Sequence, residues 1–124
     1  MAVTKRLIFS EGHFSAILDG TKKITLRSYR AGSHDFALDD VFYGEFPPEG
    51  VAFLLRATSN TQFVVAGIIP DDVAREDGYE DGGDAFEKLK EYYPNLVHDS
   101  QIAVIRFEIL THDDSPVIKY LSGV

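Results

Sequence analysis

The chain has 124 residues and a mass of 13.8 kDa, the size of one domain with one hydrophobic core. Hydrophobic residues make up 44% and charged residues 26% of it, as is typical of a globular protein, so neither a disordered nor a fibrous chain is expected. The formal charge of −8 argues against a protein that coats nucleic acid through bulk positive charge.

Charge is distributed unevenly along the chain. Residues 1–30 carry a net charge of +4 and residues 31–124 carry −12, and the stretch 71–91 holds nine carboxylates and three basic residues. Such a division is usual for a solvated surface. It also leaves room for a small basic pocket in an acidic protein.

The chain contains no cysteine, which excludes disulfides, thiolate metal ligands and a cysteine nucleophile. The apolar run 7–9 near the N-terminus is too short for the core of a signal peptide. No stretch approaches the roughly 20 apolar residues that a membrane helix needs. We therefore expect a cytoplasmic protein that has no membrane partner.

The hydrophobic pattern predicts elements in the order β-α-β-β-β-β-α-α-β. The predicted strands are 6–9, 23–29, 41–46, 51–57, 62–69 and 102–110, and the predicted helices are 11–19, a short one from Pro70 to near Gly78, and 85–93. Ser10 and Asp84 are the expected N-caps of the first and third helices. The sequence thus predicts one α+β domain over 1–124, a small mixed β-barrel with flanking short helices, with its core over about 6–110 and a C-terminal extension over 111–124.

The segment 18–28 holds the strongest candidates for catalytic or ligand-binding residues. Lys22 and Lys23 follow the first helix, and Thr25 and Arg27 project from one face of the next strand, about 7 Å apart. A lysine whose pKa is lowered by burial or by neighbouring positive charge can take the proton of the Thr25 hydroxyl. Arg27 can hold a carboxylate, a phosphate or a carbonyl oxygen. The same pattern also fits a solvent-facing strand of mixed polar residues.

The run 17–27 resembles the opening motif of the ASCH domain, a branch of the PUA-like superfamily, in which a helix ends in Gly, a Lys follows, and the strand carries Thr or Glu two residues before an Arg. Further agreement comes, in order, from Asp39-Asp40-Val41, the acidic residues before Gly78-Tyr79, the helix up to Tyr93-Pro94 and the strand at 104–107. The resemblance covers about residues 6–110. It implies a PUA-like β-barrel with a cleft between the Lys-Thr-Arg segment and the acidic end of the second helix.

ASCH proteins are linked to RNA binding, and small bacterial members include amidohydrolases that deacetylate N4-acetylcytidine. The resemblance implies that Lys22 is the base, Thr25 the nucleophile and Asp77 the proton shuttle. Asp77 stands where the family has Glu, one methylene longer, and the neighbouring Lys23 leaves the base open between two positions. The expected substrate-binding residues are Lys23, Arg27, Tyr29, Glu76 and Tyr79, of which the two tyrosines would stack on a base.

Two other functions use the same residues: a non-catalytic RNA-binding or regulatory module, and a ribonuclease with a divalent metal near Asp77. The four histidines are too scattered for a zinc site, and the acidic stretch 77–84 lacks the ligand spacing of an EF-hand. No glycine pattern for a nucleotide cofactor is present. We therefore expect no cofactor and no resident metal, and a nucleoside or single-stranded RNA as the partner.

Overall fold

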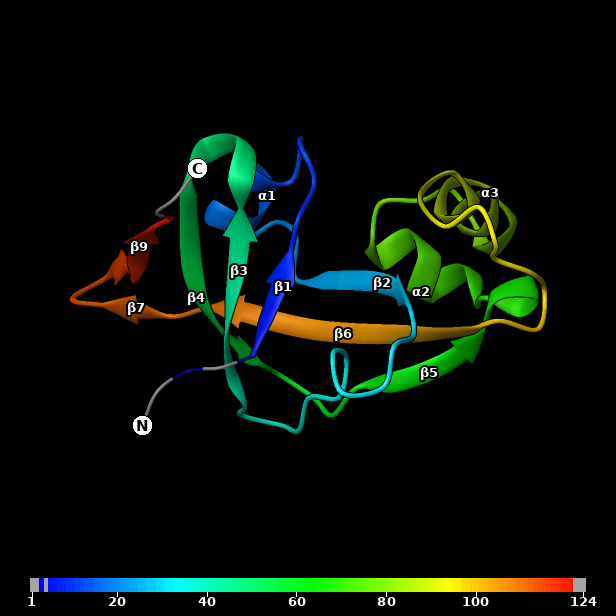
Figure 1. Cartoon of the computed structure of the whole chain (residues 1–124), viewed down its shortest axis with the longest axis horizontal. Helices are drawn as coiled ribbons and strands as arrows, with labels where there is room; N and C mark the ends of the chain where they lie inside the picture. The colour runs from blue at the N-terminus through cyan, green and yellow to red at the C-terminus, as the bar shows by residue number, and fades with distance from the viewer. Residues whose placement is uncertain (1–2, 4, 122–124) are drawn as a thin grey trace. The chain divides into compact units, whose positions relative to one another are not determined.

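The computed structural model describes residue 3 and residues 5–121 (Figure 1). These residues form two compact units, each assembled from segments that are separate in the sequence. The first unit comprises the described residues up to Lys23, Phe36–Asn60 and the described residues from Phe107 onward; the second comprises Ile24–Asp35 and Thr61–Arg106. The predicted domain over 1–124 extends beyond the described residues at both ends.

The first unit is built on a mixed sheet. Its elements are β1 (Arg6–Ile8), α1 (Phe14–Leu18), β3 (Val41–Phe46), the 3-10 turn η1 (Pro47–Glu49), β4 (Val51–Ala57), the last three residues of β6 (Gln101–Ile109), β7 (Thr111–His112), β8 (Ser115–Pro116) and β9 (Ile118–Tyr120). β1 runs parallel to β3, and β3 runs antiparallel to β4. The first part of β4 also pairs with β9 and its last part with the end of β6.

Phenylalanine rings form the core of this unit. Phe9 stacks on Phe46 with ring centroids 5.3 Å apart, and Phe53 lies 5.2 Å from Phe46. Phe42 meets the edge of Phe107 at 6.3 Å. All five side chains are buried. Burial of each contributes about 1.5–3 kcal/mol relative to an exposed ring, so these five phenylalanines serve packing.

The first helix is shorter than predicted. The pattern predicted a helix over 11–19 with Ser10 as N-cap, but α1 covers only Phe14–Leu18 and begins after His13, whose side chain makes no capping hydrogen bond. Gly12 has a φ of 96°, in the left-handed region, and an α-helix cannot continue through that conformation. The N-cap prediction is therefore wrong, because the backbone turns at Gly12 before the helix starts.

The C-terminal extension, for which no element was predicted, adds strands to the first unit. β7 and β8 form a small hairpin whose turn residues, Asp113 and Asp114, have φ values of 51° and 62°. Two consecutive positive φ angles are typical of a tight hairpin turn that follows the twist of the strands. Strands of two or three residues are too short to give a recognisable alternation in the sequence. Residues 122–124 of the extension lie outside the described residues.

The second unit is an antiparallel sheet with two helices. Its elements are β2 (Ile24–Ser28), β5 (Gln62–Val65), the 3-10 helix η2 (Ala66–Ile68), α2 (Asp71–Glu76), α3 (Gly82–Tyr92) and residues 101–106 of β6. β2 and β5 pair with opposite edges of β6, so that Leu26 and Gln62 both lie opposite Val104. Figure 1 shows α2 and α3 on one side of these strands.

The alternation predicted for β2 is confirmed. Ile24 and Leu26 belong to the buried cluster that this sheet shares with α2 and α3. Thr25 and Arg27 alternate with them and so start from the other face. Together with the first unit, this confirms the predicted α+β class with a mixed sheet and short flanking helices.

Two predicted boundaries in the second unit are corrected. The strand predicted over 62–69 ends at Val65, because Gly67 packs tightly on His98 and donates its N–H to the His98 carbonyl at 2.8 Å, which turns the chain into η2. The third helix begins at Gly82, and its N-cap is Asp81 rather than Asp84. The Asp84 N–H donates to the Asp81 side chain at 2.8 Å, and the Asp84 carboxylate in turn accepts from the backbone N–H of residue 80 at 3.0 Å.

The start of α3 generates a test of the fold. A Cβ at Gly82 would lie 1.9 Å from the Ile69 carbonyl oxygen, whereas a Cβ at Gly83 would make an ordinary contact at 3.5 Å. We expect Gly82→Ala to lower the free energy of unfolding by about 1–3 kcal/mol, because the backbone must shift. Gly83→Ala should raise it by roughly 0.5–1 kcal/mol. Urea unfolding of both variants measures this, and equal effects would contradict the packing described.

Candidate functional site

Strand β2 lies at the edge of its sheet, and one of its outward backbone groups is bound by a side chain. Tyr29 N–H donates across the sheet to Gln101 O at 2.9 Å, so the N–H of Leu26, three residues earlier, points to the open edge. It donates to Asp77 Oδ2 at 3.2 Å. The carboxylate therefore satisfies a backbone donor that the sheet leaves unpaired, and it ties the end of α2 to β2.

The position of Asp77 follows from the way α2 ends. Gly78 has a φ of 90°, its N–H donates to Arg75 O at 3.0 Å, and Tyr79 N–H donates to Ala74 O at 3.0 Å. This is the Schellman pattern of a helix C-terminus, in which glycine takes the left-handed position. Asp77 is the C-cap of the helix. The acidic residue before glycine that the sequence singled out is thus held at the strand edge by backbone geometry.

Buried Thr25 and half-buried Arg27 form a polar pair on β2. Arg27 Nε donates to Thr25 Oγ1 at 3.1 Å, and the Thr25 side chain is only 5% exposed. A hydroxyl that accepts a bond can still donate its own proton. A guanidinium beside the oxygen also stabilises negative charge that develops there. The pair therefore suits a nucleophilic hydroxyl, or a hydroxyl that binds a ligand.

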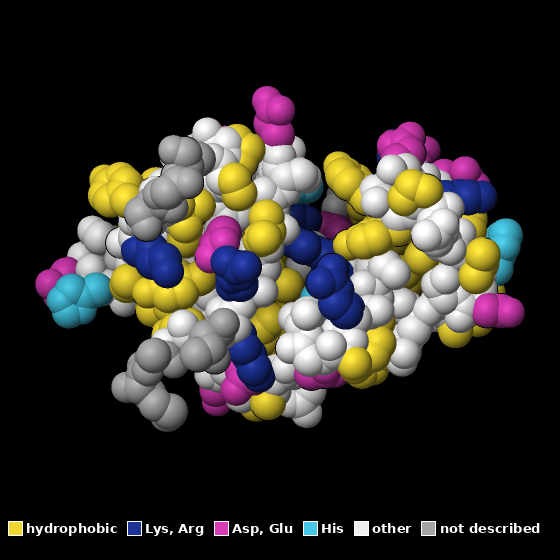
Figure 2. Space-filling model, viewed as in Figure 1, with side chains coloured by type: hydrophobic (Ala, Val, Ile, Leu, Met, Phe, Trp, Pro, Cys, Tyr) yellow, Lys and Arg dark blue, Asp and Glu magenta, His cyan; other side chains and the backbone are white. Residues whose placement is uncertain are grey.

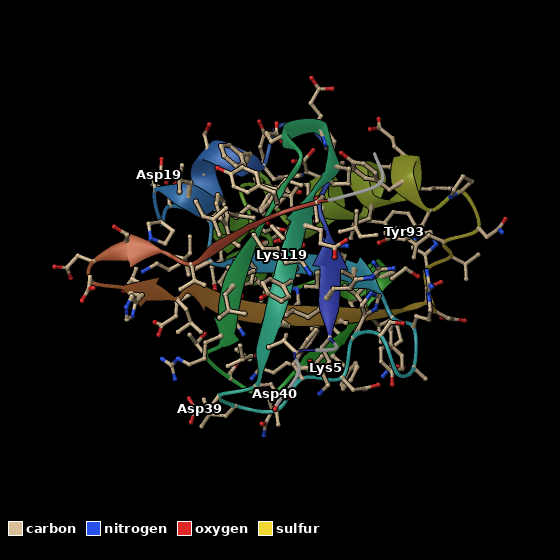
Figure 3. The ribbon with its side chains drawn as sticks, turned by 60° about the vertical axis from the view of Figure 1, so that its left-hand side comes forward. Lys5, Asp19, Asp39, Asp40, Tyr93 and Lys119 are labelled. Carbon is tan, nitrogen blue, oxygen red and sulfur yellow. The ribbon has the colours of Figure 1, made fainter. Side chains whose placement is uncertain are left out.

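Arg27 is surrounded by acidic and phenolic side chains of the second unit. Burial lowers the pKa of its guanidinium, and Tyr93, Asp77 and Tyr79 act in the opposite direction, with a hydrogen bond to the Tyr93 side chain. Tyr93 follows the last residue of α3 (Figure 3). In the sequence, Tyr93 is marked only by its place just before a proline, as the end of the predicted helix. The structure gives it a second role as a partner of Arg27.

The two tyrosines predicted to stack on a base are both held in place. Burial, followed by the charge of Asp77, raises the pKa of Tyr79 to about 12, so its phenol is neutral at physiological pH. The Tyr79 ring packs against the buried cluster of the second unit. Tyr29 donates to Asp35 Oδ1 at 2.8 Å, which raises the pKa of Tyr29, and its ring meets the edge of Phe63 at 4.9 Å.

Glu76, also predicted to bind substrate, is engaged with β6. Arg106 Nε donates to Glu76 Oε2 at 2.8 Å and its Nη2 donates to Oε1 at 3.0 Å. Such a two-pronged pair fixes the relative position of the two side chains. The carboxylate therefore holds α2 against the sheet, which keeps the neighbouring Asp77 at the edge of β2.

Lys22 and Lys23 lie in the first unit, in the loop after α1. Lys22 N–H donates to Ala16 O at 2.9 Å. Thr21 donates its N–H and its hydroxyl to Asp19 Oδ1 at 2.9 and 2.7 Å, and these bonds lower the pKa of Asp19. The loop that carries the two lysines is thus shaped by its own hydrogen bonds. The other predicted site residues, Thr25, Arg27, Tyr29, Glu76, Asp77 and Tyr79, belong to the second unit.

His34 is a buried polar residue that sequence analysis did not assign to the site. It is 8% exposed, and its Nδ1 accepts the Arg30 N–H at 3.0 Å. Burial, with the charges of Arg27 and Arg30, lowers its pKa to about 4, so the ring is neutral at physiological pH. No spacing in the sequence indicated this, because the role of His34 depends on the loop that closes around it.

The acidic stretch 71–91 is largely structural. Asp71 accepts the Gly82 N–H at 2.9 Å, and Asp81 and Asp84 cap α3. Figure 2 shows acidic side chains standing out from the surface over α3, beside lysine or arginine. Within residues 3 and 5–121, no group of three or more histidine or acidic side chains could hold a metal ion. In the same part of the chain, no helix has the length and apolarity to cross a membrane.

Protonation of His34 should be visible in the stability of the protein. The folded-state pKa of about 4 lies below the ordinary value of 6.5, so between these values the unfolded chain takes up a proton that the folded protein does not. The free energy of unfolding should therefore fall as the pH falls from 6.5 toward 4. In His34→Asn this part of the pH dependence should vanish, whereas His112→Asn, at an exposed position, should keep it. Denaturant unfolding across this range is the measurement, and parallel curves for all three proteins would contradict the assignment.

No protein-family model matches the chain, and no curated protein matches its sequence. Its fold is similar to the crystal structure of protein EF3133 from Enterococcus faecalis V583, which carries the family name DUF984. The two share 15% sequence identity with a TM-score of 0.62, over 90% of this chain and 85% of that one. At this identity the likeness shows the fold alone. That fold is compatible with the predicted PUA-like class, and membership of the ASCH family stays a prediction.

Proposed function

We propose that the protein binds a modified nucleoside or a short RNA segment and hydrolyses the amide of an N4-acetylated cytidine. One observation carries the proposal: three consecutive residues of β2 bring together the buried Thr25 hydroxyl, the Arg27 guanidinium and, bound to the backbone of the residue between them, the Asp77 carboxylate. Arg27 donates to Thr25 at 3.1 Å, and Asp77 accepts from the N–H of the residue between them at 3.2 Å. A hydroxyl supported by a cation and placed near a carboxylate is an arrangement suited to acyl transfer.

In this mechanism the Thr25 oxygen attacks the acetyl carbonyl carbon and a C–O bond forms. Lys22, the base assigned by the family resemblance, takes the hydroxyl proton, and Arg27 stabilises the charge on the reacting oxygens. Asp77, the shuttle assigned by the family resemblance, takes this proton over and delivers it to N4 of the cytosine as the C–N bond breaks, so that cytidine leaves. Water then hydrolyses the threonine ester and releases acetate.

The C-cap position of Asp77 supports a role for its short side chain. A carboxylate one methylene shorter than Glu reaches less far, which would weaken a proton shuttle. The end of α2, however, brings Asp77 Oδ2 within 3.2 Å of the β2 backbone. A longer side chain is not required to reach the strand that carries Thr25. This supports Asp77 as the functional counterpart of the family Glu.

The proposal is tested by incubating the protein with N4-acetylcytidine and measuring the cytidine released by chromatography. We expect Thr25→Ala, Lys22→Ala and Asp77→Asn each to lower turnover by about 100-fold or more, since each removes a group that moves a proton or forms a bond. Asp77→Asn keeps an oxygen that can accept the Leu26 N–H, and thermal unfolding shows whether this variant is still folded at the assay temperature. Thr111→Ala, at an exposed position of β7, should retain full turnover.

Two results would reject the enzymatic form. The first is wild-type turnover in Thr25→Ala or Asp77→Asn. The second is tight binding of N4-acetylcytidine or single-stranded RNA by a wild-type protein that releases no cytidine. The second outcome would assign the site to a non-catalytic binding module, in which case Arg27→Gln should reduce the salt dependence of RNA binding.

A further inference from the structure

The loop that follows β2 is closed by its own hydrogen bonds. Ser33 N–H and His34 N–H donate to Arg30 O at 3.1 and 3.2 Å, and Arg30 N–H donates back to His34 Nδ1 at 3.0 Å. Thr61 Oγ1 donates to the His34 carbonyl at 2.6 Å and fixes the loop from outside. The imidazole is therefore held in one orientation before any ligand binds, which reduces the entropy that binding must remove.

This loop fixes the tautomer of His34. Because Nδ1 accepts a hydrogen bond, the single proton of the neutral ring is on Nε2. Among the described residues, no acceptor is bonded to Nε2, and Nε2 is not one of their buried polar atoms that lack a partner. If Nε2 were buried, it would be among those unpartnered buried atoms, so Nε2 is in contact with solvent. His34 thus presents one N–H donor to solvent from an otherwise buried ring.

The surroundings of this donor are positively charged. Arg30 is exposed, and within the described part of the chain its guanidinium makes no ion pair or hydrogen bond. Arg27 and Arg30 both act electrostatically on His34, against a single carboxylate, Asp35. The two Asp35 oxygens accept bonds from Tyr29 O–H and Gly32 N–H, both at 2.8 Å. Two arginines and one carboxylate thus act on the His34 ring, which adds one fixed neutral donor.

We propose that Arg30, His34 and Arg27 form a subsite for a phosphate group. Arginine offers a planar pair of donors that matches phosphate oxygens, and the Nε2–H adds a third donor from a rigid loop. Arg27 connects the subsite to the proposed nucleophile on β2, since its Nε donates a hydrogen bond to the Thr25 hydroxyl. The proposal rests on the proposed function for the nucleoside part of the ligand, and it makes that ligand phosphorylated: a nucleotide, or a nucleoside within an RNA strand.

Binding measurements with four probes test the subsite: cytidine, cytidine 5′-monophosphate, inorganic phosphate, and a short single-stranded RNA without terminal phosphates. At low salt, calorimetry should show the monophosphate binding about tenfold more tightly than cytidine, as expected for added charge-assisted hydrogen bonds. Inorganic phosphate should shift the backbone amide NMR signals of residues 30–35. RNA binding tighter than that of the monophosphate assigns the phosphate to an RNA backbone; the reverse assigns it to a free nucleotide.

Three variants separate the subsite from general effects. Arg30→Gln and His34→Asn should each reduce the ratio of the two affinities to near one. Asparagine keeps an acceptor for the Arg30 N–H but has no donor at the Nε2 position. Lys88→Gln, which removes an exposed lysine of α3 paired with Asp84, should leave the ratio unchanged. If His34→Asn does not fold, Arg30→Gln decides alone, because its side chain supports no other described group.

The outcomes distinguish this subsite from the proposed function. If cytidine and its monophosphate bind equally well to the wild type, the subsite is wrong and the proposed function stands. If phosphate shifts the loop signals, and the shift is lost in both variants while no nucleoside binds, the subsite stands and the proposed function fails. A loop that responds to none of phosphate, monophosphate and RNA overturns the subsite.

Discussion

The hydrogen bond from Leu26 N–H to the Asp77 carboxylate is the contact on which the second unit and its site depend. An edge strand leaves every second backbone donor without a partner, and here a helix C-cap supplies the acceptor at 3.2 Å. Leu26 places its side chain in the core, while its two neighbours carry the polar pair. Burial of one residue thus fixes the register of the strand, and a slip by one position would exchange the polar and apolar faces.

Long patterns in the sequence predicted the fold where local preference and burial agree. β2 alternates between apolar and polar residues, β6 is a long and mostly apolar run, and both were predicted close to their observed bounds. The prediction failed where a single backbone angle, or a strand far along the chain, determines whether an element forms and where it begins. The turn at Gly12 shortens α1, and β9 exists because β4 offers it an edge.

The same division holds for the site. Thr25 and Arg27 were predicted because their spacing on a strand has chemical meaning, and Asp77 was predicted only through the family resemblance. His34 was missed, because an isolated histidine carries no signal until its loop closes on it and two arginines surround it. Glu76 was predicted as a ligand contact, and the structure shows its carboxylate bound to Arg106, a partner 30 residues away that no local pattern indicates.

The position of β6 near the end of the chain governs how the protein reaches its fold. Within the described residues, β2 and β5 pair with β6 and with no other strand, and β2 lies about 80 residues before it in sequence. Loop closure over such distances is slow compared with helix formation. During synthesis, β2 and its polar pair therefore remain unpaired until the last quarter of the chain has emerged. The arrangement of hydroxyl, cation and carboxylate is among the last parts of the molecule to form.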